Sequence, residues 1–576
     1  MALMGAVADK AYGLNKIGSI ADDDPALAQW VQANDRQAER ILNPAGSASR
    51  LYVRGLGQQS TVLASAYVTS TSAYYSKEEV ALRLQSITKE LLSLQAADGT
   101  INSGNLESPP DTGFLVELLA AARYILRNRN EAVMETVKQG LDVFLKKTGG
   151  SLLTGGVHTP NHRWVICSAL SKLYRLYPDP AYLKRIDEWL GEGIYMDADG
   201  HYPERSAGIY AVVENHSLIS MATHLNRPAL LEYVRRNLRM TWYYLQPNGD
   251  VVTNDSRRQD QFQEWKAYAY YPLYRHMAIV DGNGTFAAIA DFIASMEGFE
   301  ENVMQRYYFT FLEHEEMRKP MPVRRMPSTD YEKLIDTTHL LRIRRGDISA
   351  TLFGGVDWPL VIASGRSNSP DFFSYRKGRA ILQSLRLSTS FFSMGYFYSE
   401  GLRKEGTRYV LQQRMESPYY QPLPPGKRNK LGDYTLEPST DARFWSKMQF
   451  RDRPQSNVKQ EDIRVVFQEK NGEVELQIEV TGAPNVPITL ELCFRQGGVL
   501  TGVVPIGADD YRLEAGEAVY KMGDDTICFG SGSWQHEKIT ALEGERYSTH
   551  FGSLRMKGMH VYLTGITPFK HTLYFR

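Results

Sequence analysis

The spacing of apolar residues divides the chain into two parts of different character. From about residue 25 to residue 295, apolar residues recur every three or four positions, which is the period of a helix with one buried face. The clearest predicted helices are Glu78–Leu94, Thr112–Leu126, Glu131–Leu145, Arg163–Leu176, Pro228–Leu245 and Gln261–Val280. This N-terminal part is therefore predicted to be helical.

Beyond residue 335 the period shortens toward two, which is typical of strands with one buried face. The predicted strands include Leu340–Arg344, Val361–Ala363, Ile381–Leu387, Ile463–Phe467, Val474–Val480, His560–Thr564 and Thr572–Phe575. Asn471-Gly472 lies between two of these segments and is a strong signal for a tight hairpin. Many short strands separated by turn residues predict an antiparallel β-sandwich.

The domain organisation follows from this change of period. A chain of 576 residues is too long for one ordinary hydrophobic core. We predict a helical domain over residues 1–312, a charged and proline-containing linker over 313–335, and a sandwich domain over 336–576.

Glycine-bearing pairs recur through the helical part at intervals of about 50 residues. The pairs are Asp98-Gly99, Gly149-Gly150, Asp199-Gly200 and Asn248-Gly249. A unit of this length fits two helices and their loops, and Gly after Asp or Asn suits the left-handed residue that ends a helix. Such units wind into an (α/α) toroid or stack into a solenoid, and both arrangements gather the loops at one end, where a cleft can form. The competing interpretation is that these loops are polar only because every loop of a helical array is polar.

Composition narrows the possible partners. Lys and Arg total 66, as do Asp and Glu, so the net charge gives no reason to expect nucleic acid or a membrane surface as a partner. Apolar runs are too short to span a bilayer, and the first residues lack the pattern of a signal peptide. A leader removed from the sequence would leave the same picture, so the compartment stays open: cytoplasmic, or periplasmic or secreted.

The three cysteines lie in apolar surroundings without the spacing of metal ligands. Cys167, Cys493 and Cys528 are interpreted as buried free thiols, with a Cys493–Cys528 disulfide as the alternative.

Two polar segments stand out one repeat apart. The first, residues 158–164, begins a predicted helix with Asn161, His162 and Arg163, and the second, residues 200–210, contains Arg205 and Tyr210. Each follows a glycine-bearing pair, Gly149-Gly150 or Asp199-Gly200, so we expect both at the same end of the array. A lone His on an amphipathic helix is usually a structural residue, so the proposal depends on the two segments together.

These side chains suit proton removal next to a carboxylate. The C5 proton of a uronic acid is weakly acidic, and contacts from Asn, His or Arg to the adjacent carboxylate stabilise the enolate formed by its removal. Tyrosine, with an ordinary pKa of about 10, exchanges protons effectively when cations lie nearby, and it can also protonate the departing glycosidic oxygen. Arginine can bind the carboxylate through two hydrogen bonds. The combination predicts β-elimination without a cofactor.

The same residues carry a family resemblance. The stretch DGHYPERSAGIY at 199–210, the upstream Asn161-His162 pair and the polar run after Asn248-Gly249 resemble the heparinase II/III-like and alginate lyase polysaccharide lyases. In that family an Asp-Gly segment with following Glu and Ser leads to the catalytic tyrosine; Tyr210 holds that place here, with Ala207 where proline is common.

The resemblance implies both a fold and a set of roles. It implies an α+β multidomain chain, with an N-terminal incomplete (α/α) toroid followed by a C-terminal antiparallel β-sandwich. It further implies that Asn161 neutralises the substrate carboxylate, His162 assists or acts as base, and Tyr210 acts as acid or base. No cofactor is expected.

One departure from the family pattern affects the expected site. The family's sandwich domain usually brings a histidine to the cleft and can hold a metal there, whereas the matching segment at 364–371 contains no histidine. Arg366 or Asn368 could replace it, or His216 from the helical part. This predicts an outlying branch, which includes exo-acting lyases that release a terminal sugar such as rhamnose from glucuronic acid.

The predicted function is thus a polysaccharide or oligosaccharide lyase that cleaves at C4 of a uronic acid, with glucuronate favoured, and leaves a 4,5-unsaturated uronide. The expected partner is an acidic glycan; the oligomeric state is open, and no metal is assigned. The expected substrate-binding residues are Arg163, Trp164, Glu204, Arg205, His216, Asn254, Arg257 and Arg366.

Two other classes of function are compatible with the sequence. A glycoside hydrolase on an (α/α) toroid needs paired carboxylates roughly 5 to 10 Å apart, and Asp111, Glu204 and Asp255 follow successive loops. A non-catalytic glycan-binding protein would use aromatic stacking platforms instead. The candidates are Trp164, Trp265, Tyr268 and Tyr271.

Overall fold

The structure is a computed structural model that describes residues 25–44, 53–261, 263–355, 361–362, 365–366, 369–441, 445–539 and 555–576. The chain forms two compact units. Unit 1 comprises Met1–Glu192, His224–Asn226 and Glu297–Pro320, and unit 2 comprises Gly193–Thr223, Arg227–Met296 and Met321–Arg576. In the described part no helix is long and apolar enough to cross a membrane.

Unit 1 is helical. Its elements are α1 (Pro25–Leu42), α2 (Val53–Val68), α3 (Glu78–Leu94), α4 (Pro109–Ile125), η1 (Leu126–Asn128), α5 (Ala132–Thr154), α6 (Pro160–Leu176), α7 (Pro180–Leu190), η4 (Glu300–Met304), α12 (Gln305–Tyr307), α13 (Phe309–Glu313) and η5 (Glu315–Arg318). Ser108 caps α4 by accepting a hydrogen bond from Asp111 N, and Asp179 caps α7 by accepting one from Ala181 N. Helix α4 packs against α2, α5 and α6.

Unit 2 contains the remaining helices and both large sheets. Its helices are α8 (Tyr210–His224, of which His224 is assigned to unit 1), η2 (Pro228–Leu230), α9 (Leu231–Tyr244), η3 (Ala267–Tyr270), α10 (Tyr271–Asp281) and α11 (Gly284–Ala294), with the short turns η6 (Phe391–Ser393), η7 (Pro425–Lys427) and η8 (Phe450–Asp452) among the strands. Asn283 caps α11 through its side-chain oxygen, and Gly282, in the left-handed region, ends α10.

The first large sheet follows the order β1-β2-β3-β6-β7-β15-β21-β18-β17, with β8 on β7. These strands are β1 (Asp330–Ile335), β2 (Leu340–Arg345), β3 (Ile348–Phe353), β6 (Phe373–Lys377), β7 (Ala380–Thr389), β8 (Gly395–Tyr396), β15 (Pro487–Phe494), β17 (Val504–Pro505), β18 (Asp510–Arg512) and β21 (Met559–Ile566). Its pairs are antiparallel except β18 with β21.

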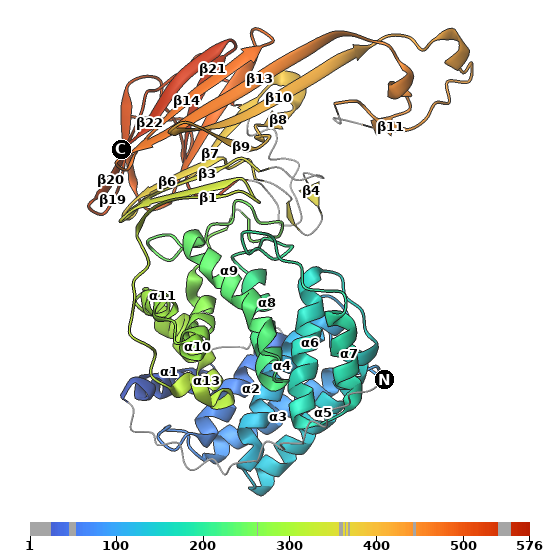
Figure 1. Cartoon of the computed structure of the whole chain (residues 1–576), viewed down its shortest axis with the longest axis vertical. Helices are drawn as coiled ribbons and strands as arrows, with labels where there is room; N and C mark the ends of the chain where they lie inside the picture. Colours follow the sequence, from blue (N-terminus) through green and yellow to red (C-terminus); the bar gives the residue numbers. More distant parts are fainter. Residues whose placement is uncertain are drawn as a thin grey trace, which may run out of the picture. The chain divides into compact units, whose positions relative to one another are not determined.

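The second large sheet follows the order β16-β19-β20-β22-β14-β13-β10-β9. Its strands are β9 (Leu402–Glu405), β10 (Arg408–Tyr420), β13 (Gln455–Lys470), β14 (Glu473–Gly482), β16 (Val499–Thr501), β19 (Glu517–Met522), β20 (Asp525–Gly530) and β22 (Phe569–Phe575), and two small pairs are β4 (Val361–Ile362) with β5 (Gly365–Arg366) and β11 (Glu437–Pro438) with β12 (Trp445–Ser446). One buried apolar cluster draws residues from both large sheets, as expected for a sandwich. Strands β10 and β13 continue beyond their neighbours as a two-stranded ribbon toward β11 (Figure 1).

The hairpin prediction is confirmed. Lys470 pairs with Glu473 at the end of β13 and β14, and Asn471 and Gly472 have φ of 55° and 87°. Two successive residues in the left-handed region are what a type I′ turn requires.

Two predictions about the helical part are wrong. Helix α5 continues to Thr154, so Gly149 and Gly150 lie inside a helix and end no repeat unit. The predicted helix Gln261–Val280 begins later: η3 starts at Ala267 and α10 at Tyr271. The other three glycine pairs do form turns, with φ of 97° at Gly99, 104° at Gly200 and 77° at Gly249.

The cysteines are free. Cys167 and Cys493 are buried and Cys528 is half-buried, so the interpretation as free thiols is confirmed and the alternative disulfide is not formed.

Candidate functional site

Tyr210 is the first residue of α8, and the preceding loop fixes how that helix begins. Ser206 Oγ accepts a hydrogen bond from Tyr210 N at 3.1 Å, and Ser206 O accepts one from Ala211 N at 2.9 Å. Arg205, directly before Ser206, has a φ of 51°, a conformation that non-glycine residues adopt at a cost of about 1 kcal/mol or more. The residue proposed to move a proton is thus held by a capped and strained loop.

The hydroxyl of Tyr210 receives two hydrogen bonds. Gln259 Nε2 donates to it at 2.6 Å and Arg258 Nη2 at 3.2 Å, and the Arg258 guanidinium carbon lies 4.3 Å from the centre of the tyrosine ring. Arg258 also forms an ion pair with Glu204, and both residues are buried. Because each donor can serve a phenolate as well as a phenol, this arrangement suits a tyrosine that exchanges a proton.

A buried carboxyl group lies beneath the same loop. Asp260 is fully buried; it accepts a hydrogen bond from Gly208 N at 3.0 Å and one from Ser256 Oγ. Burial raises the pKa of Asp260 to about 6, although the hydrogen bonds from Ser256, Ser206 and Gly208 oppose the rise. Gly208 has no room for a side chain, since an added Cβ would lie 2.9 Å from Asp260 Oδ2 and from the ring of Trp265. The turn before Tyr210 therefore packs directly on this carboxyl group.

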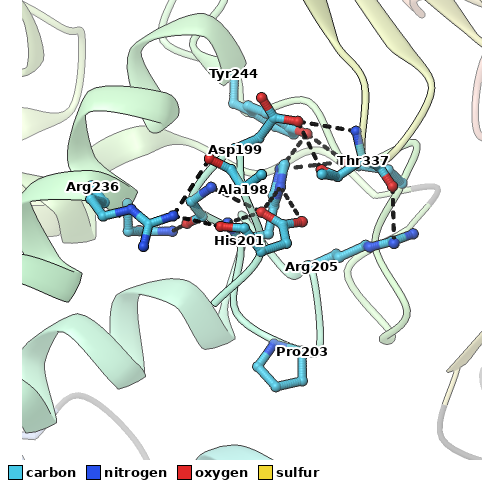
Figure 2. Close-up of polar contacts among 12 residues, drawn as sticks. Ala198, Asp199, His201, Pro203, Arg205, Arg236, Tyr244 and Thr337 are labelled. Atoms are coloured by element: carbon cyan, nitrogen blue, oxygen red, sulfur yellow. Dashed lines mark hydrogen bonds and ion pairs between the residues drawn. The ribbon is translucent and has the colours of Figure 1, made fainter. Parts of the chain in front are cut away.

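The start of the loop is held by a buried histidine (Figure 2). His201 Nδ1 lies 3.1 Å from Asp197 Oδ2 and Nε2 lies 2.7 Å from the hydroxyl of Tyr244, which donates a hydrogen bond to Asp255. Burial alone would raise the pKa of Asp197, but the hydrogen bond and charge of His201 hold it well below its usual range. This chain links the loop to α9 and to the segment that carries Arg258.

The turn between β1 and β2 also forms hydrogen bonds with the loop (Figure 2). Asp199 Oδ2 accepts hydrogen bonds from Thr337 N at 3.0 Å and Thr337 Oγ1 at 2.9 Å, while Arg205 Nη2 donates to Thr337 O at 3.1 Å. From α9, Arg236 Nη2 donates to Asp197 O at 2.6 Å. The loop is thus tied to the first sheet on one side and to α9 on the other.

The other predicted catalytic segment lies in unit 1, at the start of α6. Asn161 is fully buried and its Nδ2 donates to Thr159 Oγ1 at 3.0 Å, while His162 N donates to Thr159 O at 3.2 Å. Arg163 forms an ion pair with Glu192 at 2.8 Å. Since Tyr210 belongs to unit 2, the joining of Asn161, His162 and Tyr210 in one site stays a prediction.

Trp164 is 1% exposed and packs under the Arg163 guanidinium, so little of its ring is left for a sugar. Tyr271 is likewise buried, whereas Trp265 and Tyr268 are half-buried. Two of the four aromatic residues considered as stacking platforms are therefore core residues.

The remaining predicted binding residues have varied surroundings. Arg257 Nη1 donates to Pro203 O at 2.9 Å, and Asn254 Nδ2 donates to Asp371 O at 2.8 Å. His216 is half-buried in α8. Arg366 lies in β5, but its side chain and the whole of Asn368 fall outside the described part of the chain. Arg257 thus supports the Glu204 loop, and Asn254 joins the segment after Gly249 to the residues that lead into β6.

The carboxylates considered for a hydrolase are already engaged with other side chains. Asp111 forms an ion pair with Arg54 in unit 1, Glu204 is paired with Arg258, and Asp255 accepts the Tyr244 hydroxyl. Asp260, which the sequence did not single out, is a carboxyl group of this region whose pKa is raised by burial.

Among the described residues, one group of three has the donors of a metal site. His224, Glu313 and His314 in unit 1 bring their ligand atoms within 4.8 Å of one another. Glu313 already accepts hydrogen bonds from Lys172 at 2.9 Å and Arg175 at 2.8 Å. A divalent cation would be held beside two fixed positive charges, so this donor set fits a metal poorly.

Arg258, Gln259 and Asp260 were missed from the sequence. They belong to the polar run 254–261, which interrupts the helical period after the Asn248-Gly249 turn. A polar run without periodicity, at the place where the resemblance continues, was the signal available for them.

Comparison with known proteins concerns the fold. Neither a family profile nor a curated protein sequence matches the chain. The structure of heparinase III is similar with a TM-score of 0.55 and 12% identity, covering 97% of this chain and 87% of that one. The structure of chondroitin AC lyase of Streptomyces coelicolor A3 in complex with chondroitin sulphate is similar with a TM-score of 0.53 and 12% identity, and the match covers 96% of this chain and 79% of that one. The structure of Paenibacillus xanthan lyase is similar with a TM-score of 0.55 and 8% identity, and the match covers 96% of this chain and 57% of that one. The predicted fold class, an (α/α) toroid followed by an antiparallel β-sandwich, is confirmed: this chain shares the fold of these lyases.

Proposed function

We propose that this protein is a polysaccharide or oligosaccharide lyase that cleaves the bond at C4 of a uronic acid by β-elimination. The observation that carries the proposal is the pair of donors, Arg258 and Gln259, on the hydroxyl of Tyr210. The shared fold with lyases of acidic glycans supports it.

In the proposed reaction the C5–H bond breaks, its electron pair forms the C4–C5 double bond, and the C4–O bond breaks. The departing glycosidic oxygen takes up a proton. Tyr210, as a phenolate stabilised by Arg258 and Gln259, takes up the C5 proton and then donates a proton to the departing oxygen. Because Arg258 is buried and paired with Glu204, its guanidinium is already oriented before substrate arrives.

The substrate carboxylate needs a separate partner. We assign this role to Asn161 and His162, as the resemblance implies, with Asn161 stabilising the enolate that forms when the C5 proton leaves. Glucuronate is the proposed uronic acid, and release of a terminal sugar, as in a rhamnose-glucuronate lyase, is the proposed mode of action.

The identity of the product tests this proposal. Glucuronate-containing glycans, alginate and glycosaminoglycans would each be incubated with the protein, and near-ultraviolet absorbance would be followed together with new reducing ends. Elimination yields an absorbing 4,5-unsaturated uronide in step with the reducing ends. New reducing ends without that absorbance would show hydrolysis and reject the lyase proposal.

A further inference from the structure

A polar pocket lies within unit 2, between the segment after the Gly249 turn and the first sheet. Its volume is about 60 Å³, enough for a few water-sized groups. The side chains that matter most here are Asp250, Glu264, Trp265, Asp371, Arg376 and Arg495. The pocket can therefore take the hydroxyl-bearing edge of a sugar ring, with the rest of the ring in solvent.

The first acid of the pocket is neutralised by its neighbours. Asp250 is buried and accepts contacts from Arg376 Nη1 at 2.5 Å, Arg495 Nη2 at 2.8 Å and Lys266 Nζ at 2.5 Å. Burial works against ionisation, but these cations hold the pKa of Asp250 well below its usual range. Asp250 is thus an ionised carboxylate in contact with three cationic side chains.

The other two acids are paired as well. Asp371 forms an ion pair with Arg386, which is 1% exposed, and Glu264 lies 3.3 Å from Arg495 Nε. Counting these partners, three carboxylates face four cations, a net charge of +1, and each of the four cations already has a carboxylate partner. Paired carboxylates keep free lone pairs that accept O–H groups, and Arg376 Nε has no hydrogen-bond partner among the described residues.

The pocket adjoins the loop that carries Tyr210. Trp265 lines the pocket, donates from Nε1 to Asp260 O at 3.2 Å, and lies against Gly208, two residues before Tyr210. A ring bound at the pocket would therefore lie beside the site of elimination.

We propose that this pocket binds a neutral, hydroxyl-rich sugar next to the uronic acid. An anionic ring would have to compete with Asp250, Asp371 and Glu264 for guanidinium groups that already have partners. Hydroxyl groups can donate to those carboxylates and accept from Arg376 without disturbing the pairs. The proposal rests on the lyase function and narrows it to substrates in which the uronic acid is linked to a neutral sugar.

Direct binding tests the pocket without relying on catalysis. Saturation-transfer NMR would compare neutral hexoses and 6-deoxyhexoses with free glucuronate, for the wild-type protein, Arg376→Ala and Gln383→Ala. Asp250 keeps two cations in Arg376→Ala, and Gln383→Ala changes a pocket residue that carries no charge. Arg414→Ala, which removes an exposed surface arginine, is the matched control.

A neutral sugar is expected to bind the wild-type protein and the control equally, with little change between low and high salt. In either pocket variant its dissociation constant should rise by about tenfold, which corresponds to the loss of one good hydrogen bond. Preferential binding of glucuronate that weakens steeply with salt, or absence of binding by every neutral sugar, would overturn the proposal.

A turnover assay then separates the two proposals. If the lyase proposal holds, glycans with uronic acid linked to neutral sugar should be cleaved at least about tenfold more efficiently than a polyuronate, with the preference in KM. A polyuronate cleaved equally well would reject the pocket proposal but leave the lyase proposal standing. Binding of a neutral sugar without any elimination would reject the lyase proposal but leave the pocket proposal standing.

Discussion

The segments around Gly150 and Gly200 carry similar sequence signals but have different structures. Gly200 follows Asp199, has a φ of 104°, and donates its N–H to Asp197 Oδ1 at 2.9 Å. Gly149 and Gly150 lie within α5, where no Asp or Asn precedes them to offer an acceptor. Of these two segments, the glycine forms a turn only in the one where a neighbouring side chain accepts its N–H.

The function of each glycine differs accordingly. At Gly149 a side chain would collide with the hydroxyl of Tyr182, so its small size permits close packing between α5 and α7. At Gly200 the backbone itself requires glycine, and the loop that follows leads through strained Arg205 to Tyr210. Regular packing marks the first segment, and a strained, densely hydrogen-bonded loop marks the second, as is common where chemistry takes place.

The largest contrast should come from the ion pair that each segment forms. Arg258→Ala leaves buried Glu204 without its partner and is expected to lower the free energy of unfolding by about 3–5 kcal/mol. Arg163→Ala breaks a pair in which Glu192 is 52% exposed and should cost about 1 kcal/mol or less. Urea denaturation measures both, and equal effects would contradict the difference drawn between the segments.

The glycines give the next contrast. Gly200→Ala forces a positive φ on alanine and places Cβ 3.0 Å from Arg236 O, which should destabilise the protein by about 2 kcal/mol. Gly150→Ala meets no atom within 4 Å and replaces a helix-interior glycine, so a gain of about 0.5–1 kcal/mol is expected. Thermal unfolding of both variants measures the sign of each change in stability. Destabilisation by Gly150→Ala would contradict the predicted difference between the two glycines.

The smallest effect is the pH dependence due to Asp260. Its pKa is raised from 3.8 to about 6 in the folded protein, so its contribution to stability is fully present below pH 4 and is lost as the pH rises through 6. Asp260→Asn should remove this loss, on the order of 1–3 kcal/mol between pH 4 and pH 7. Glu117→Gln gives a second test, because burial raises the pKa of Glu117 to about 7, and this variant should remove a loss of stability that runs from about pH 4.5 to pH 7. A wild-type pH profile left unchanged by Asp260→Asn would contradict the assignment.

Local signals predicted the fold well. The hairpin at Asn471-Gly472 and the turns at Gly99, Gly200 and Gly249 each depend on a few neighbouring residues, and the change of period separated helices from strands. The turn predicted at Gly149-Gly150 was wrong because Gly149 instead lies in a helix and leaves room for Tyr182, 33 residues later in the chain.

The candidate site was predicted only in part, because much of it depends on distant contacts. Tyr210 was found from its local motif, but its partners Arg258 and Gln259 lie 48 and 49 residues away. Arg495 reaches Asp250 across 245 residues. Nothing in the local pattern of a strand end indicates which loop its arginine will contact.

The central claim is that Tyr210 moves the proton, and Tyr210→Phe tests it most directly. The phenylalanine keeps the ring under Arg258 and removes only the hydroxyl. We expect kcat for formation of the unsaturated uronide to fall by about 10²- to 10⁴-fold, with substrate binding retained by calorimetry. Tyr195→Phe, at a residue 61% exposed, should leave kcat unchanged. A Tyr210→Phe protein that turns over within twofold of the wild type would contradict the account.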